Sequence, residues 1–151
     1  MDRIVLRSGL SGFVLLDEIR DAGPDTVTGC KRFERAPLYL GIEALAQLGA
    51  FHVRYLVDFA KHAFLLGVKR CSLPPVEELD GPFRLSGKLE SRSSAAFSYR
   101  LGGVGEGGTA MEGEFLFALA EYDGAGFGAD ILRAHYRKVF SCLRSGSKTN
   151  C

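Results

Sequence analysis

An α+β fold, in which one antiparallel sheet curls around one long helix, is predicted by two features of this sequence. Residues 37–61 form an almost wholly apolar helix candidate, which other structure must surround over most of its circumference. Residues 83–90, 94–101 and 110–121 alternate apolar with polar side chains, as strands do when one face is covered. One long helix and one antiparallel sheet satisfy each other only if the sheet wraps around the helix.

The helix candidate begins at Pro37, which suits a first helical position because its missing N–H costs nothing there. The polar residues that follow are spaced by four, seven, four and three positions and form one narrow stripe, made of Glu43, Gln47, Arg54, Asp58 and Lys61. This stripe is the side of the helix expected to face solvent or a second subunit.

A hairpin is expected before the helix. Residues 13–19 form a short, strongly apolar run that is typical of a buried strand. Residues 21–25 are rich in turn formers, and a second strand is expected over 26–31.

Further elements are expected after the helix. Residues 63–68 form a continuous apolar run, which adds a fourth strand to the three alternating ones. The glycine-rich segment 102–108 lies between two strands and lacks the helix and Gly-Lys-Ser/Thr sequence of a phosphate-binding loop, so a hairpin turn is expected. Residues 129–143 place apolar and basic side chains on opposite sides, which predicts a short amphipathic C-terminal helix.

The length of 151 residues corresponds to one domain. We expect this domain to occupy residues 1–122. Residues 123–144 are expected to form a helical extension packed on the same domain, and residues 145–151 a disordered tail.

Composition argues against several classes of protein. The net charge is only +1, with 19 basic and 18 acidic residues, so a nucleic-acid-binding protein is not expected. The start of the chain does not look like a signal peptide, and no apolar stretch reaches membrane-spanning length, which favours a cytoplasmic protein with no membrane partner. The four cysteines form no C-x-x-C pair or zinc-type spacing, so no metal and no cofactor are expected. Cys30 is interpreted as a small buried hydrophobe rather than a reactive thiol.

The stretch GIEALAQ, from Gly41 to Gln47, carries a family resemblance. Together with Pro37 six residues before Glu43, it resembles the start of the central helix in FabA/FabZ-type β-hydroxyacyl-acyl carrier protein dehydratases. Leu38 stands where the family has glycine. Two strand segments, 13–19 and 79–85, also resemble the family, and the likeness covers about residues 12–121. It implies the hotdog fold of that family.

The resemblance also implies site residues. Glu43 matches the catalytic glutamate and Gln47 the nearby glutamine, while Pro37, Leu38 and Leu40 at the helix start are expected to bind substrate. In the family a histidine from one subunit meets the glutamate of the other. One group removes the α-proton of a β-hydroxyacyl thioester and the other protonates the departing hydroxyl.

This chain departs from the family at that histidine. The corresponding position is Gly29, and residues 30–36 contain no histidine. His52 is half a turn out of phase with Glu43, and His62 is nineteen residues further along the predicted helix. His135 lies outside the matched region and is the least excluded substitute.

Three functions stay open at this point. The chain is one half of a heterodimeric dehydratase, a thioesterase that uses Glu43, or a non-catalytic acyl-binding or scaffold subunit. Its expected partners are an acyl carrier protein or a coenzyme A thioester, and a second hotdog chain in a homodimer or heterodimer. Five basic residues are candidates for binding an acidic carrier or coenzyme A phosphates, with a solvated surface as the simpler alternative: Lys69, Arg70, Lys88, Arg92 and Arg100. The simpler interpretation of Glu43 is a solvent-facing carboxylate favoured by the helix macrodipole.

Overall fold

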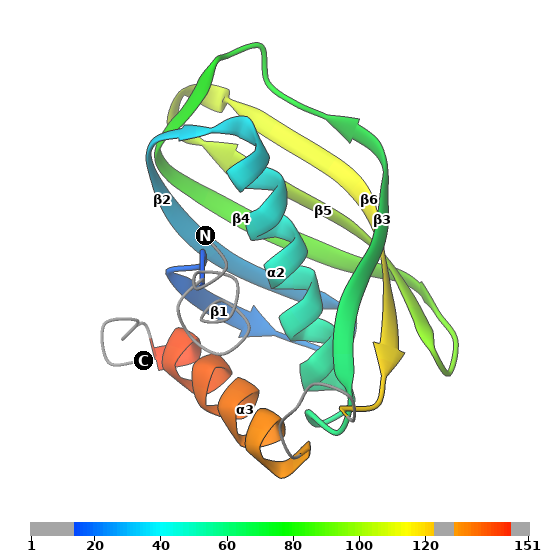
Figure 1. Cartoon of the computed structure of the whole chain (residues 1–151). Coiled ribbons are helices and arrows are strands. Elements are labelled where there is room, and N and C mark those ends of the chain that lie inside the picture. Colours follow the sequence, from blue (N-terminus) through cyan, green and yellow to red (C-terminus); the bar gives the residue numbers. More distant parts are fainter. Residues whose placement is uncertain (1–13, 123–128, 146–151) are drawn as a thin grey trace.

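The structure, a computed structural model, describes residues 14–122 and 129–145. Its elements in chain order are β1 (Glu18–Ala22), β2 (Thr26–Pro37), α2 (Leu38–Leu56), β3 (His62–Ser72), β4 (Glu78–Arg92), β5 (Ala96–Gly105), the short 3-10 turn η1 (Glu106–Gly108), β6 (Ala110–Ala120) and α3 (Ala129–Ser145). Within these residues one sheet has the order β1-β2-β4-β5-β6-β3, and every neighbouring pair is antiparallel. Figure 1 shows the sheet curled around α2, which confirms the predicted α+β architecture.

The inner face of the sheet takes every second residue of its central strands. On β5, Phe97, Tyr99 and Leu101 are at most 1% exposed, and their neighbours on β6 include Phe115 and Phe117. The rings of Tyr99 and Phe117 meet edge to face at 5.6 Å, a favourable aromatic geometry. The alternation in the sequence therefore identified the covered face of these strands correctly.

Two glycines allow α2 to lie close against this inner face. A Cβ atom on Gly49 would lie 2.6 Å from the ring of Phe117, and one on Gly41 would lie 2.6 Å from the Sδ atom of Met111. The helix face that carries these glycines is therefore turned to the sheet. The opposite face, which carries Glu43, is left for other elements to cover.

The helix ends earlier than expected. α2 stops at Leu56 rather than near residue 61, because the chain forms a Schellman-type end. The N–H of Phe59 donates to the Arg54 carbonyl at 2.7 Å and that of Asp58 to the Tyr55 carbonyl at 3.1 Å. Asp58 and Phe59 have φ angles of 54° and 59°, which an α-helix cannot continue.

Pro37 is not the first helical residue, as was expected, but the last residue of β2 and the N-cap of α2. The ring fixes φ at −65° there, and ψ of 154° keeps the residue extended. The expected first helical position is therefore taken by Leu38.

The hairpin before α2 is shifted along the sequence. β1 runs from Glu18 to Ala22, so the strand expected over 13–19 overlaps it only at its end. Leu16 is nevertheless fully buried, and the Asp17 N–H donates to the Cys30 carbonyl at 3.0 Å. Residue 13 lies outside the described residues. The second strand continues past residue 31 to Pro37, because it pairs with β4 along most of its length.

The glycine-rich segment does form a hairpin between β5 and β6, as expected. Gly102 to Gly105 extend β5, and the turn itself is η1. Gly107 and Gly108 adopt φ angles of 81° and 87°, which only glycine takes readily.

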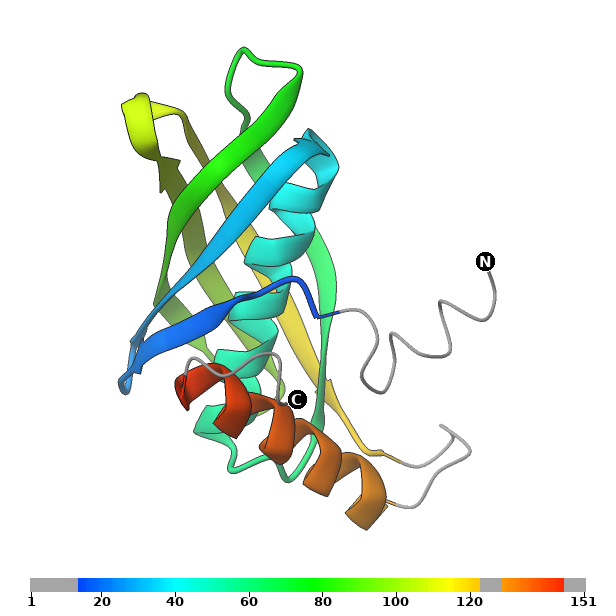
Figure 2. The same ribbon diagram turned by 90° about the vertical axis from the view of Figure 1, so that its left-hand side faces the viewer.

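The C-terminal helix α3 packs across the end of α2 (Figure 2). Its inner side buries Leu132, Val139, Phe140 and Leu143, as the amphipathic pattern predicted. Residues 123–128, which begin the expected extension, and 146–151 of the expected tail lie outside the described residues.

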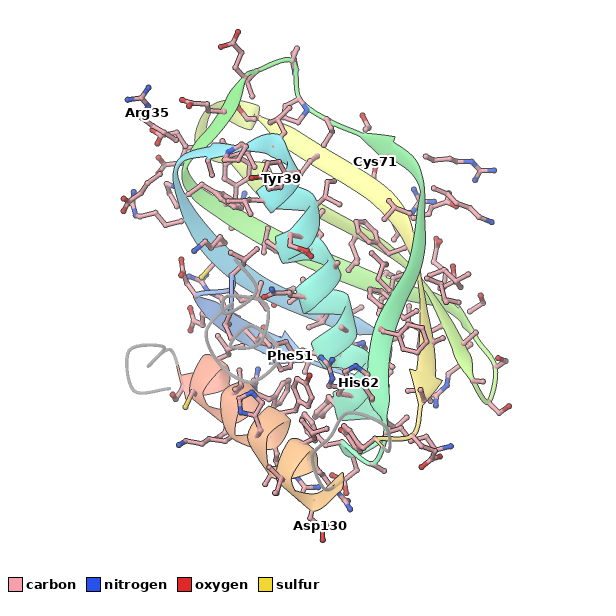
Figure 3. All side chains as sticks on the ribbon, viewed as in Figure 1. Arg35, Tyr39, Phe51, His62, Cys71 and Asp130 are labelled. Carbon is pink, nitrogen blue, oxygen red and sulfur yellow. The ribbon has the colours of Figure 1, made fainter. Side chains whose placement is uncertain are left out.

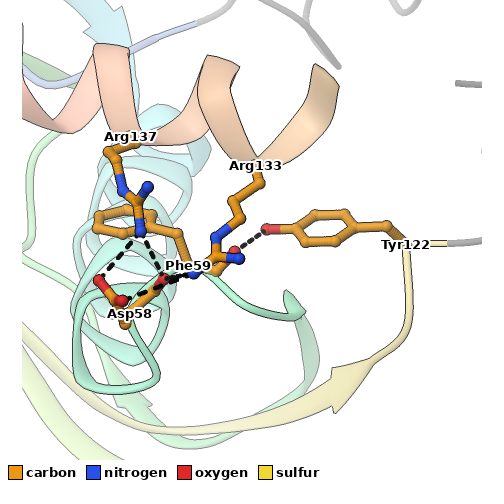
Figure 4. Close-up of polar contacts among 5 residues, drawn as sticks. All are labelled: Asp58, Phe59, Tyr122, Arg133 and Arg137. Carbon is orange, nitrogen blue, oxygen red and sulfur yellow. Dashed lines mark hydrogen bonds and ion pairs between the residues drawn. The ribbon is translucent and has the colours of Figure 1, made fainter. Parts of the chain in front are cut away.

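Polar contacts from α3 hold the end of α2 in place (Figure 4). Arg137 donates to the carbonyl and carboxylate of Asp58, each at 3.1 Å, and Arg133 lies 3.5 Å from the same carboxylate. The Tyr122 hydroxyl donates to the Phe59 carbonyl at 3.0 Å. These contacts stabilise the left-handed backbone at Asp58, a residue type that tolerates that conformation better than most.

The close approach at Gly49 gives the first prediction. Alanine normally stabilises a helix relative to glycine, but here its methyl would collide with the fully buried ring of Phe117. We expect Gly49→Ala to lower the free energy of unfolding by about 1–3 kcal/mol in urea denaturation.

Gly41→Ala is the matched control. Its methyl would meet the ends of the Met111 and Leu79 side chains, which can move aside, so a smaller loss is expected. A Gly49→Ala variant as stable as the native protein would contradict this packing.

Candidate functional site

A cavity of about 210 Å³ lies on the face of α2 that the sheet leaves uncovered. It is half open, is lined mainly by α2, the start of β3 and α3, with Val14 and Phe117 completing the wall, and is called the α2–α3 cavity below. From α2 it receives Glu43, Gln47, Phe51 and Arg54, which share one helix face because they are spaced by four, four and three residues. The predicted polar stripe therefore lines a cavity over most of its length.

Glu43 is a half-buried member of this wall. Among the described residues, its carboxylate makes no hydrogen bond or ion pair. It lies in the second turn of α2, and the first turn has no acidic residue, so the field of the helix N-terminus does not account for its position. A half-buried carboxylate on the wall of a cavity is available to act on a ligand.

Gln47 has a positioning role. Its Oε1 atom accepts a hydrogen bond of 2.8 Å from the Leu15 N–H, which ties the segment before β1 to the outer face of α2. Val14 of that segment lines the cavity. Gln47 thus helps to build the wall next to Glu43.

The three residues expected to bind substrate lie elsewhere. Pro37 is exposed at the end of β2, and neither it nor Leu38 lines the α2–α3 cavity. Leu40 lines a separate hollow with Leu15, residues 31–34 and Ala36. The structure brings Glu43 and Gln47 together, and a role for the other three in substrate binding stays a prediction.

His52 is a structural residue. It is fully buried, its Nε2 lies 2.8 Å from the Gly23 carbonyl, and its Nδ1 lies 2.6 Å from the Tyr99 hydroxyl. Because a carbonyl only accepts, Nε2 carries the proton, and the neutral ring accepts from Tyr99 at Nδ1. Burial lowers the pKa of His52, in agreement with the neutral form. This histidine joins the β1–β2 turn to β5 and points away from Glu43.

His62 lies at the start of β3 instead of on an extended helix. Thirteen residues of α2, about 20 Å of rise, separate Glu43 from Leu56, after which the chain turns toward His62. The two side chains therefore lie near opposite ends of the helix, and Figure 3 shows His62 beside the C-terminal end of α2. Burial lowers the pKa of His62, and its Nδ1 atom is buried without a hydrogen-bond partner among the described residues.

His135 of α3 shares the cavity with Glu43. Its neighbour Tyr136 packs edge-on against Phe51 at 6.4 Å, and eight residues, about 12 Å of helical rise, separate Phe51 from Glu43. His135 therefore enters the cavity at the end remote from Glu43. Its pKa is lowered, first by burial and then by the charges of Arg54 and Lys138.

Sequence reasoning missed the burial of Arg54. Its spacing placed it correctly on the polar stripe, but α3 covers that part of the stripe and leaves Arg54 only 7% exposed. The guanidinium group stacks on Tyr136 with 4.0 Å between its central carbon and the ring centroid. The sequence held one signal of this burial: an arginine on the polar stripe, together with a C-terminal amphipathic helix whose aromatic residues could cover it.

The basic residues considered for carrier binding are mostly neutralised. Arg70 pairs with Glu114 at 2.8 Å, Lys88 with Asp25 at 3.3 Å, and Arg100 with Glu90 and Glu112 at 3.4 and 3.6 Å. Arg92 lies over the ring of Phe97 at 4.7 Å, while Lys69 is exposed on β3. These contacts favour the simpler interpretation of a balanced, solvated surface.

Cys30 is half-buried, with its thiol 3.5 Å from a carboxylate oxygen of Glu18. Burial, assisted by that carboxylate, raises the pKa of the thiol and makes it a poor nucleophile. Within the described residues, no group of three or more His, Cys, Asp or Glu side chains is arranged to hold a metal ion. No helix in that part of the chain has the length and apolar character to cross a membrane.

Comparison with solved structures identifies the fold. The dehydratase heterocomplex ApeI:P from Xenorhabdus doucetiae matches with a TM-score of 0.61 and 14% identity, over 72% of this chain and 84% of that one. The chain has the hotdog fold. A thioesterase from Haemophilus influenzae matches this hotdog chain with a TM-score of 0.58 and 8% identity, over 73% and 82% of the two chains.

A hypothetical thioesterase from Streptococcus pneumoniae, solved with coenzyme A, matches with a TM-score of 0.59 and 12% identity, over 69% and 88%. No protein-family model matches the sequence, and a search of curated proteins finds no match. At these identities the likeness establishes the hotdog fold alone.

The buried state of His52 gives the second prediction. The native protein resists protonation of His52 because its pKa is lowered, whereas the unfolded chain binds the proton near the ordinary pKa of about 6.5. We expect the contribution of His52 to the free energy of unfolding to be constant above that pH. As the pH drops below it, this contribution and the free energy of unfolding are expected to fall. Urea denaturation from about pH 7.5 to about pH 5 measures the slope.

The comparison of two variants isolates His52. The hydrogen bond to Gly23 and the charge of Asp25 oppose the lowering of the His52 pKa, while the charge of Arg92 adds to it. His52→Gln is expected to flatten the slope more than His135→Gln, because His135 is only half-buried. An unchanged slope in His52→Gln would show that His52 titrates alike in both states.

Proposed function

We propose that this hotdog chain handles acyl thioesters and acts as the glutamate-bearing half of a heterodimeric dehydratase. The observation that carries the proposal is the place of Glu43: a half-buried carboxylate on the wall of the α2–α3 cavity, whose one lining histidine among the described residues, His135, enters at the remote end. The motif around it resembles that of β-hydroxyacyl-acyl carrier protein dehydratases. One structure that shares its fold is a dehydratase heterocomplex.

In the proposed reaction, a histidine of the partner subunit completes the pair. One group takes the α-proton of a β-hydroxyacyl thioester, and the other protonates the β-hydroxyl, which leaves as water and gives the enoyl thioester. A single carboxylate can do one of these steps but not both at once. This chemistry explains how a chain can keep Glu43 without a histidine of its own at the position where the family has one.

The free edge of β3 is the proposed contact with the partner. Within the described residues β3 pairs only with β6, so its other edge offers backbone groups that no described strand pairs with. Phe64, Leu65 and Leu66 are 39%, 39% and 54% exposed there, and the first two also line the α2–α3 cavity. The later part of β3 carries exposed Lys69 and Arg70, charges that discourage pairing. A subunit on the apolar part would cover the wall of the cavity.

A thioesterase is the second candidate. A lone carboxylate can act as nucleophile or general base on a thioester carbonyl. Two of the structures with this fold are thioesterases, one of them solved with coenzyme A. In this alternative Glu43 needs no partner histidine.

The main experiment mixes this chain with a histidine-bearing hotdog protein encoded beside it and follows enoyl thioester formation from a β-hydroxyacyl thioester. We expect activity in the mixture and none in the single chain. Glu43→Gln is expected to lower the rate of the mixture by about 10²–10⁴-fold, the usual effect of a general acid or base.

Glu34→Gln is the matched control, because it removes an exposed carboxylate from β2, outside the α2–α3 cavity. Equal rates for the two variants would exclude Glu43 from the chemistry. If instead the single chain releases free thiol from acyl-coenzyme A and Glu43→Gln abolishes this release, the thioesterase replaces the dehydratase half. A mixture as inactive as the single chain contradicts the heterodimer.

The contact at β3 has its own test. Leu66 lies at a bulge between Leu65 and Gly67 and does not line the cavity, so its replacement leaves the site intact. Leu66→Lys is expected to raise the dissociation constant of the dimer at least about tenfold, because a charge must then be buried in the contact. Analytical ultracentrifugation measures this, with Val104→Lys as an exposed control on β5. An unchanged constant would place the contact elsewhere.

A further inference from the structure

Arg54 is a buried cation without a counter-ion among the described residues. It is 7% exposed, and no carboxylate of residues 14–122 or 129–145 lies within ion-pair distance of it. Burial of an unpaired charge is costly, so such a group is normally paired or given several hydrogen bonds. Among the described residues, Arg54 has no ion-pair partner and only one hydrogen bond.

The contacts of Arg54 satisfy only part of its guanidinium group. Its Nη2 donates to the Ala63 carbonyl at 2.9 Å. The central carbon of the guanidinium group lies over the rings of Tyr136 and Phe51, at 4.0 and 5.4 Å from their centroids. Its Nε atom is buried, and no described residue accepts a hydrogen bond from it. This N–H donor is thus unused, and within the described part of the chain the positive charge is offset by two rings and one carbonyl.

The surroundings of Arg54 also favour an anion. Nδ1 of His62 is a second buried polar atom without a partner, and the ring of His62 lies 5.8 Å from that of Tyr136. The pKa values of His62 and His135 are lowered by burial first and by the charge of Arg54 second, which places both rings within its field. Arg54 therefore makes this end of the α2–α3 cavity electropositive, and His135 adds a hydrogen-bonding ring to the lining, whereas His62 does not line the cavity.

Apart from Glu43, Gln47, Arg54, His135 and Tyr136, the described residues that line the cavity are apolar. Arg54 lines it together with Ala50, Phe51, Phe64 and Val139. The volume of about 210 Å³ is modest: a cavity of about 150 Å³ in another protein holds benzene, whereas drug-sized ligands need at least about 300 Å³. The space fits a short alkyl chain or a single ring.

We propose that the α2–α3 cavity binds a small organic acid, whose apolar body fills the cavity and whose carboxylate is held by the guanidinium group of Arg54. A carboxylate matches the planar fork of arginine and needs one positive charge. A phosphate carries more charge and would need further cations, whereas Arg54 is the only arginine or lysine among the described residues that line the cavity. This site shares the α2–α3 cavity with Glu43 but does not need Glu43 as a catalyst, so either proposal can fail alone.

The first test needs only the native protein. Binding of a series from acetate to octanoate is measured by calorimetry and by NMR shifts, with each acid compared to its uncharged amide. We expect an optimum near hexanoate and an affinity at least about tenfold above that of hexanamide. Equal affinity for acid and amide, or no binding across the series, would overturn the proposal.

Variants then assign the effect to Arg54. Arg54→Met, which keeps bulk and removes charge, is expected to lower hexanoate affinity at least about tenfold, and Arg54→Lys to lower it less. Lys138→Met is the matched control, since it removes an exposed charge from α3 and leaves Arg54 in place. Loss of hexanoate binding in Lys138→Met but not in Arg54→Met would refute the assignment. If Arg54→Met fails to fold, the acid–amide comparison and Arg54→Lys still decide.

Two sources of the carboxylate can be distinguished. Glutaryl-coenzyme A carries a free carboxylate at the end of its acyl group, and pentanoyl-coenzyme A does not. Tighter, Arg54-dependent binding of the glutaryl compound supports a site for the far end of a thioester-bound acyl group. Equal binding of the two thioesters, with Arg54-dependent binding of hexanoate, supports a site for the free acid.

Discussion

The burial of one face of α2 in the curled sheet is the constraint on which the rest of this structure depends. The contact is close because Gly41 and Gly49 have no side chains where Met111 and Phe117 reach the helix. It fixes the rotation of the helix about its axis. The opposite face, with Glu43, Gln47 and Arg54, must then be covered by other parts of the chain, and the α2–α3 cavity lies where that cover is incomplete.

The covering elements explain why the two ends of the cavity differ in chemistry. Near Glu43 the cover is the extended segment before β1, tied down through the Gln47–Leu15 hydrogen bond. Near Arg54 the cover is α3, whose Tyr136 ring lies over the guanidinium group, so that Arg54 is buried. The Schellman-type end of α2, held by Arg137 and Tyr122, sets the distance between α2 and α3 at this place. The half-buried carboxylate of Glu43 and the buried guanidinium group of Arg54 thus line one cavity.

The sequence was sufficient for the parts of the fold that depend on periodicity. The alternation around Phe97 and Phe115 identified strands and their buried face, and the spacing of Glu43 and Gln47 placed both on one side of the helix. The end of α2 could not be predicted, because residues 57–61 are compatible with a helix. The left-handed turn at Asp58 depends on contacts with α3, far along the chain. The burial of Arg54 was missed for the same reason.

The central claim is that the Glu43 carboxyl group works at the boundary between two hotdog subunits. A crystal structure of the chain assembled with its histidine-bearing partner measures this most directly, through the distance from the Glu43 carboxyl group to the nearest imidazole of the other subunit. We expect both groups to face one shared cavity, with a substrate analogue between them at hydrogen-bonding distances of about 2.6–3.2 Å. Glu43 in bulk solvent, remote from any atom of the second subunit, would contradict the claim.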